Sequence, residues 1–111
     1  MKYLGDPKKL EEWLSDYAEL DSLYIEANAN KIIPDLICWP GLTALDNFSD
    51  DEFNKFEIWI KTSGYKSFLS KEQIEDVVSN MAQQNPNYTN NQLIEAIDYY
   101  WKFDAFICIE S

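Results

Sequence analysis

Three short helix-start patterns constrain the fold of this chain more than any other feature of its sequence. Each pattern places Ser or Thr three residues before Glu or Gln, and the pairs are Ser49–Glu52, Ser70–Gln73 and Thr89–Gln92. In such a capping box, each side chain accepts a hydrogen bond from the other residue's backbone N–H at the start of a helix. Apolar residues at helical spacing follow every box. The sequence therefore predicts helices over residues 50–63, from Ser70 to about residue 84, and from Thr89 to about residue 101.

The other segments predict one more helix and four strands. An Asp-Pro pair followed by apolar residues at helical spacing predicts a first helix over residues 7–18. Alternating residues over 23–27 predict a strand with one buried face, and residues 35–39 are its expected hairpin partner. Residues 65–69 predict a third strand. Residues 104–109 are nearly all apolar, which is typical of a strand at the centre of a sheet.

The order of these elements predicts the fold class. A length of 111 residues is typical of a single domain, here taken as residues 1–111. Strands connected by helices, with one hairpin, predict an α+β (or α/β) fold in which about four helices pack on a mixed sheet of about four strands.

The residue types present exclude most catalytic mechanisms. The sequence contains no His and no Arg, and so lacks the commonest general base, the commonest metal ligand and the bidentate phosphate-binding side chain. Cys38 and Cys108 each lie in an apolar segment, which predicts free, buried thiols. We therefore expect no enzymatic activity, no metal and no cofactor. A hydrolase with a pair of catalytic carboxylates is the alternative, although the sequence favours no particular pair.

The charge is strongly negative and uneven. Twenty Asp and Glu residues face nine Lys, for a net charge of −11, and twelve of those acids lie in residues 11–57 beside Lys31 and Lys55 alone. Such a surface repels nucleic acids and anionic membranes and attracts basic proteins. The alternative is that the acids serve only solubility. If they serve binding, we expect them to form one concentrated negative face.

The segment from residue 40 to residue 52 is the candidate binding surface, because acids cluster there at the start of a helix. A solvated loop followed by an ordinary helix start is the alternative interpretation. The residues predicted to contact a partner are the following: Asp46, Asp50, Asp51, Glu52 and Glu57, with Trp39 as an aromatic anchor.

The N-terminal sequence contains no apolar run typical of a signal peptide, and no segment approaches membrane-spanning length. We therefore expect a cytoplasmic protein that does not contact a membrane.

The C-terminal part of the chain carries a resemblance to a known group of proteins. The segments that carry it are Gln73–Val78, Asn85–Thr89, Leu93–Tyr100 and Asp104–Phe106, within residues 64–107. They resemble a family of small acidic bacterial proteins of unassigned function, similar to the immunity proteins that accompany toxins of contact-dependent growth inhibition and related competition systems. The matching positions are caps, turns and core positions, so the resemblance assigns no functional residue.

The resemblance and the charge together lead to a functional hypothesis. It is an immunity protein that neutralises a cognate basic toxin domain by covering its cleft with carboxylates. We expect the toxin to be a nuclease, because clefts that bind RNA or DNA are cationic. The alternative is an acidic nucleic-acid mimic or regulatory adaptor that binds a basic DNA- or RNA-binding protein.

Overall fold

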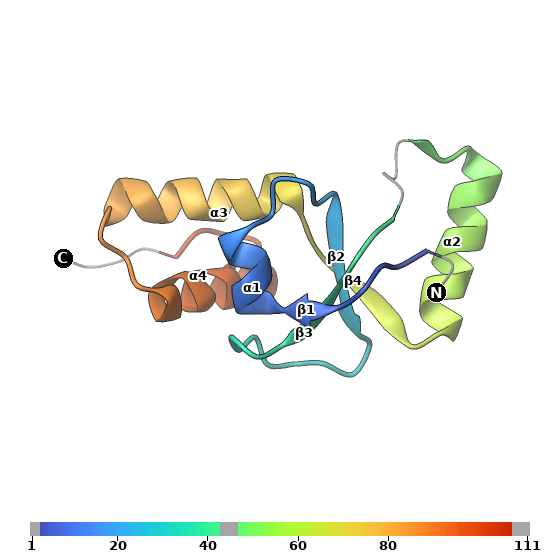
Figure 1. Cartoon of the computed structure of the whole chain (residues 1–111), viewed down its shortest axis with the longest axis horizontal. Helices are drawn as coiled ribbons and strands as arrows, with labels where there is room; N and C mark the ends of the chain where they lie inside the picture. Colours follow the sequence, from blue (N-terminus) through green and yellow to red (C-terminus); the bar gives the residue numbers. More distant parts are fainter. Residues whose placement is uncertain (1–2, 43–46, 108–111) are drawn as a thin grey trace.

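The chain forms a four-stranded sheet with helices on both sides (Figure 1). The computed structural model describes residues 3–42 and 47–107. Its elements are, in chain order, β1 (Lys8–Lys9), α1 (Leu10–Ser15), β2 (Ser22–Glu26), β3 (Ile37–Pro40), α2 (Asp50–Thr62), β4 (Tyr65–Ser70), α3 (Lys71–Gln84) and α4 (Asn90–Phe103). These four helices and four strands confirm the α+β class.

The sheet has the strand order β1-β3-β2-β4, and every described pairing in it is antiparallel. The pair Tyr24↔Trp39 lies in the β2–β3 pairing, which confirms the predicted hairpin partner. The prediction of a mixed sheet was wrong, because no two of these neighbouring strands run in parallel. β2 and β4 pair from Ser22↔Ser70 to Glu26↔Tyr65, with an irregularity in register between Leu23 and Tyr24.

The three capping boxes form as the sequence predicts. The hydroxyl oxygens of Ser49, Ser70 and Thr89 each accept a hydrogen bond of 3.2 Å from the backbone N–H three residues later. The Glu or Gln at that position accepts a hydrogen bond from the N-cap backbone N–H in return. Local chemistry therefore sets the starts of α2, α3 and α4.

The first predicted helix is shorter than expected. It begins at Leu10 instead of residue 7, and residues 8–9 form β1 against Ile37 and Cys38. The backbone N–H of Leu10 donates to Leu36 O at 2.7 Å, so pairing with a distant segment keeps the preceding residues extended. A local helix-start signal is overridden here by tertiary hydrogen bonds.

The strand predicted over residues 104–109 is absent from its described part, residues 104–107. α4 continues to Phe103, and Asp104 follows with a left-handed backbone (φ 51°). Phe106 then stacks on Tyr100, with ring centroids 5.5 Å apart, and the carbonyl oxygen of Ile107 accepts a hydrogen bond of 2.8 Å from Gln84 Nε2. These apolar residues pack on helices instead of joining the sheet.

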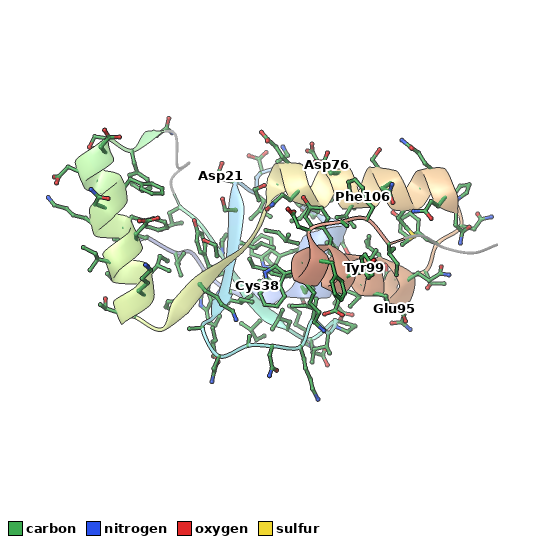
Figure 2. All side chains as sticks on the ribbon, turned by 180° about the vertical axis from the view of Figure 1, so that it is seen from behind. Asp21, Cys38, Asp76, Glu95, Tyr99 and Phe106 are labelled. Carbon is green, nitrogen blue, oxygen red and sulfur yellow. The ribbon has the colours of Figure 1, made fainter. Side chains whose placement is uncertain are left out.

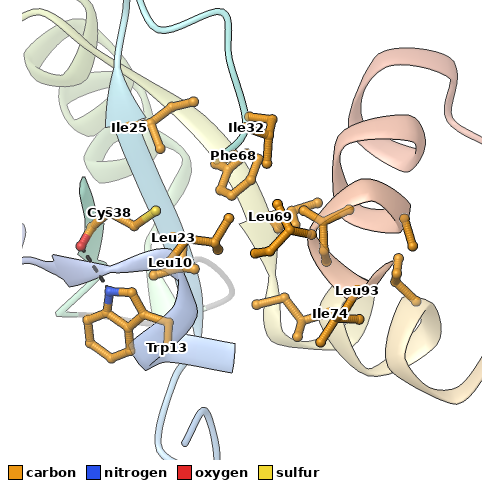
Figure 3. Close-up of a cluster of buried hydrophobic side chains, with 14 of the residues drawn as sticks. Leu10, Trp13, Leu23, Ile25, Ile32, Cys38, Phe68, Leu69, Ile74 and Leu93 are labelled. Atoms are coloured by element: carbon orange, nitrogen blue, oxygen red, sulfur yellow. Dashed lines mark hydrogen bonds between the residues drawn. The ribbon is translucent and has the colours of Figure 1, made fainter. Parts of the chain in front are cut away.

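The sheet separates two groups of buried side chains. The main cluster is largely aliphatic and lies between the sheet and α1, α3 and α4; Figure 3 shows part of it. The small cluster, under α2, contains buried Leu4, Tyr24, Phe56 and Ile60. β2 contributes Leu23 and Ile25 to the main cluster and Tyr24 to the small one. The prediction that this strand buries only one face was therefore wrong.

Cys38 is a buried free thiol of the main cluster, as expected, whereas Cys108 lies outside the described residues. Burial raises the pKa of the Cys38 thiol to about 12. The backbone carbonyl oxygen of Cys38 accepts a 2.9 Å hydrogen bond from Trp13 Nε1, and this bond connects α1 to β3 (Figure 3). None of the helices in residues 3–42 and 47–107 combines the length and the hydropathy that a membrane span requires.

Candidate partner-binding surface

The first turn of α2 brings three of the predicted binding residues together. Asp50, Asp51 and Glu52 are all exposed there, at the helix end whose dipole favours negative charge. Asp51 Oδ2 lies 3.2 Å from Lys55 Nζ, and Glu52 Oε1 accepts a 3.0 Å hydrogen bond from the Ser49 hydroxyl. Two of the three carboxylates therefore have a local partner on or beside the helix. Asp46 lies outside the described residues.

Glu57 is also exposed on α2, seven residues after Asp50 and therefore on a similar side of the helix. It lines a groove of about 180 Å³ between α2 and β4, together with Phe53 and Ile60. The structure thus places four of the predicted residues on one helix.

Trp39 ends the strand predicted over residues 35–39, and the structure confirms that it lies in a strand. It belongs to β3 and is half-buried, and its ring packs edge-on against Tyr65 with centroids 5.0 Å apart. Tyr65 stacks in turn on Trp59 of α2, at 6.1 Å. Trp39 is therefore part of the packing under the helix that carries the carboxylates.

Aromatic side chains that the sequence analysis overlooked position α2. Phe48 stacks on Phe56 with centroids 5.4 Å apart, and Tyr3 meets Phe56 and Trp59 edge-on at 5.2 Å each. The signal for Phe48 was present, because an apolar residue directly before an N-cap often packs on the new helix. Tyr3 lacks such a signal, since its contacts depend on where the N-terminal segment runs.

The first turn of α2 is part of a longer acidic surface. Figure 1 shows the α1–β2 connection, the start of α2 and helix α3 along one long side of the molecule, and Figure 2 shows Asp21 and Asp76 on that side. The backbone N–H of Lys71 donates to Asp21 O at 2.9 Å, so the connection and the start of α3 are neighbours. We call this surface the acidic border; its carboxylates are Asp16, Glu19, Asp21, Asp50, Asp51, Glu52, Glu72, Glu75 and Asp76.

The two lysines of these segments already have partners. Lys55 pairs with Asp51, and the Lys71 ammonium lies 3.9 Å from a Glu75 oxygen while donating to Ala18 O at 2.9 Å. Eight of the nine carboxylates are exposed, and Asp21 is half-buried. The acidic border therefore presents a large excess of negative charge.

The acids of residues 11–57 do not form one face by themselves. β2 ends at Glu26 on the opposite long side, where the β2–β3 connection also carries Asp35 (Figure 1). Asp35 lies 3.4 Å from Lys9 Nζ. The concentrated negative surface instead combines acids from both halves of the chain, and those of α3 were missed because the strand order was unknown.

Sequence comparison assigns the chain to a family without a described role. A family model described as "Domain of unknown function (DUF7716)" matches residues 7–109, a range that includes all eight helices and strands. The chain belongs to the DUF7716 family. No curated protein and no solved structure matches this DUF7716 chain. In the described part of the chain, no group of three or more His, Cys, Asp or Glu side chains is placed to hold a metal ion.

Proposed function

We propose that this DUF7716 protein is a cytoplasmic immunity protein that neutralises a basic toxin domain, a nuclease, by covering its cleft with the acidic border. The observation that supports the proposal most is the charge of that border: nine carboxylates belong to three segments that lie along one long side, and the two lysines of those segments, Lys55 and Lys71, are already paired.

The physical basis is competition for a cationic cleft. A nuclease binds phosphates with Lys and Arg side chains, and carboxylates can pair with the same cations. Opposite charges also steer the two proteins together, which raises association rates by about 10- to 1,000-fold at low salt. The border lies along a molecule 48 Å in length, long enough to face an extended nucleic-acid cleft.

The test begins with the gene directly upstream of the one encoding this chain. Its product should arrest bacterial growth when expressed alone, and co-expression of this chain should restore growth. The purified proteins should form a complex whose association slows as salt is added. A harmless upstream product, or one that this chain neither binds nor neutralises, would contradict the proposal.

A charge-matched pair of variants tests the acidic border itself. The double substitution Asp50→Lys and Asp51→Lys should reduce the association rate at low salt by about tenfold or more and weaken its salt dependence. The control, Glu26→Lys with Glu95→Lys, changes the net charge equally at exposed positions outside the border. Equal rates for the two variants would remove α2 from the interface. Binding to several basic proteins, with displacement by duplex DNA, would identify a nucleic-acid mimic instead.

A further inference from the structure

A cleft of about 420 Å³ opens between the α1–β2 connection and the end of β3. Apolar side chains form much of its lining, and two acids of the acidic border also line it. The lining residues are Lys8, Trp13, Asp16, Glu19, Leu20, Pro40, Gly41 and Leu42. The cleft therefore combines an apolar interior with carboxylates.

One wall of the cleft is an aromatic ring held in a fixed position. Trp13 is 8% exposed, and its Nε1 donates to Cys38 O at 2.9 Å. The ammonium of Lys8 lies 4.7 Å from the centroid of the same ring. The faces of Trp rings attract cations. The wall thus already contacts one positive charge.

The opposite wall is held by the backbone. The N–H of Gly41 donates to Ser22 O and that of Leu42 donates to Tyr3 O, both at 2.9 Å. A Cβ at Gly41 would approach the Tyr24 ring to 3.2 Å, so this strand end lies close to the sheet. Leu42 is nevertheless 60% exposed, and it leaves apolar surface at the cleft available to a partner.

The cleft is lined by two carboxylates and by one cation, Lys8, whose ammonium lies over the Trp13 ring, so its net charge is negative and favours a cationic occupant. Asp16 and Glu19 are exposed, and among the described residues no ion pair involves either of them. An anionic occupant would be repelled, and a purely apolar one would cover the carboxylates without pairing them. A cation on a long apolar stem matches both features, which describes a Lys or Arg side chain.

We infer that this cleft receives an arginine or lysine side chain of the protein partner. The apolar stem packs against Leu20 and Pro40, and the charged group pairs with Asp16 or Glu19. The inference rests on the proposed function, because it assumes a basic protein as partner. Long-range attraction alone would not distinguish one basic protein from another, whereas a side chain seated in a shaped pocket does.

The probe for this site is N-acetyl-arginine amide, added to the isotope-labelled full chain and followed by NMR. The indole N–H of Trp13 and the backbone N–H signals of Gly41 and Leu42 should shift in a saturable manner. The matched probe is N-acetyl-citrulline amide, which has a similar shape but no charge. It should bind at least tenfold more weakly. Absence of a shift at Trp13, or equal binding of the two probes, would overturn the inference.

Charge-neutral variants test the two carboxylates. Asp16→Asn with Glu19→Gln should weaken binding of the arginine probe at least tenfold, whereas Glu11→Gln with Glu26→Gln should leave it unchanged. All four residues are exposed, and matching urea-unfolding curves would show that both variants are folded. Equal probe affinity in the two variants would contradict the assigned role of Asp16 and Glu19.

The inference and the proposed function can fail separately. If the chain binds the arginine probe saturably but neutralises no toxin, the cleft remains a binding site for a cationic side chain and the immunity role is rejected. Conversely, a toxin complex that keeps its affinity after Asp16→Asn with Glu19→Gln would retain the immunity role and reject the cleft as an anchor.

Discussion

The two sides of the sheet are packed in different ways. The main cluster contains sixteen buried residues, twelve of them aliphatic. The small cluster contains only four, surrounded by five aromatic residues that are partly buried. Those five are Tyr3, Trp39, Phe48, Trp59 and Tyr65. The side that carries α1, α3 and α4 is therefore packed mainly by aliphatic side chains, whereas α2 packs through stacked and edge-on aromatic rings.

This difference concerns function because α2 carries four of the predicted binding residues. Stabilisation by burial grows with the apolar area removed from water, at about 25 cal/mol per Å². The small cluster has four buried residues against sixteen in the main cluster, so less apolar area is removed from water beneath α2 than on the other side of the sheet. We therefore expect α2 to open locally at a lower free energy than the rest of the fold, as binding elements commonly do.

The largest expected effect comes from a cavity in the main cluster. Ile97 is fully buried, and Ile97→Ala should lower the free energy of global unfolding by about 4 kcal/mol in urea titrations. We expect α2 amides to exchange through local opening of α2, during which the main cluster around Ile97 stays packed. The substitution should therefore leave hydrogen exchange in α2 at the wild-type rate. The control Ile58→Ala, at a position 63% exposed, should change stability by less than about 0.5 kcal/mol. Faster exchange in α2 of the Ile97 variant would show that both clusters unfold as one unit.

A cavity in the small cluster should give a different pattern. Phe56 is 5% exposed and contacts Tyr3, Tyr24 and Phe48. Phe56→Ala should cost about 3 kcal/mol, and α2 amides should then exchange faster along with those of α3 and α4. Wild-type exchange rates in α2 of this variant would mean that the small cluster does not hold the helix.

The two clusters also differ in titratable groups, and the thiol of Cys38 in the main cluster gives the third prediction. The folded pKa, about 12, lies above the ordinary value of 9.0, so the folded state favours the protonated thiol. This stabilisation is complete below pH 9 and is lost as the pH rises towards 12. The unfolding free energy of the wild type should fall more steeply than that of Cys38→Ala, by up to about 1.4 kcal/mol per pH unit.

The measurement is a set of urea titrations between pH 8 and pH 10.5. Burial also raises the pKa of Tyr24, which acts in the same direction, but this residue is present in both proteins and its effect cancels. Parallel curves for the wild type and Cys38→Ala would show that the thiol is accessible to water in the folded state.

The sequence predicted the parts of the fold that local chemistry determines. The starts of α2, α3 and α4 follow from side chains three residues apart, and this is also why Asp50, Asp51 and Glu52 were correctly placed together. β1 could not be predicted in the same way, because residues 8–9 are held extended by hydrogen bonds that involve residues 34–38. Local helix signals carry no information about such distant partners.

The acidic border shows the same limit for the candidate site. Its α3 acids join those of the α1–β2 connection only because β2 begins where β4 ends, at the pair Ser22↔Ser70. That neighbourhood depends on strand order. The contact of Trp39 with Tyr65 could not be predicted for a related reason, because the side of the sheet that each strand residue faces depends on what covers that side.

The smallest effect also compares the two clusters directly, because a capping hydroxyl can be removed at a helix start on each side. The hydroxyls of Ser49 and Thr89 cap α2 and α4 with bonds of equal length, 3.2 Å. Ser49→Ala and Thr89→Ala should each lower the global unfolding free energy by about 1 kcal/mol. Only Ser49→Ala should speed hydrogen exchange in α2, by about fivefold, since the cap of α4 stays intact while α2 opens. Faster α2 exchange in both variants would show that α2 does not open independently, and the comparison between the two clusters would then have no consequence for binding.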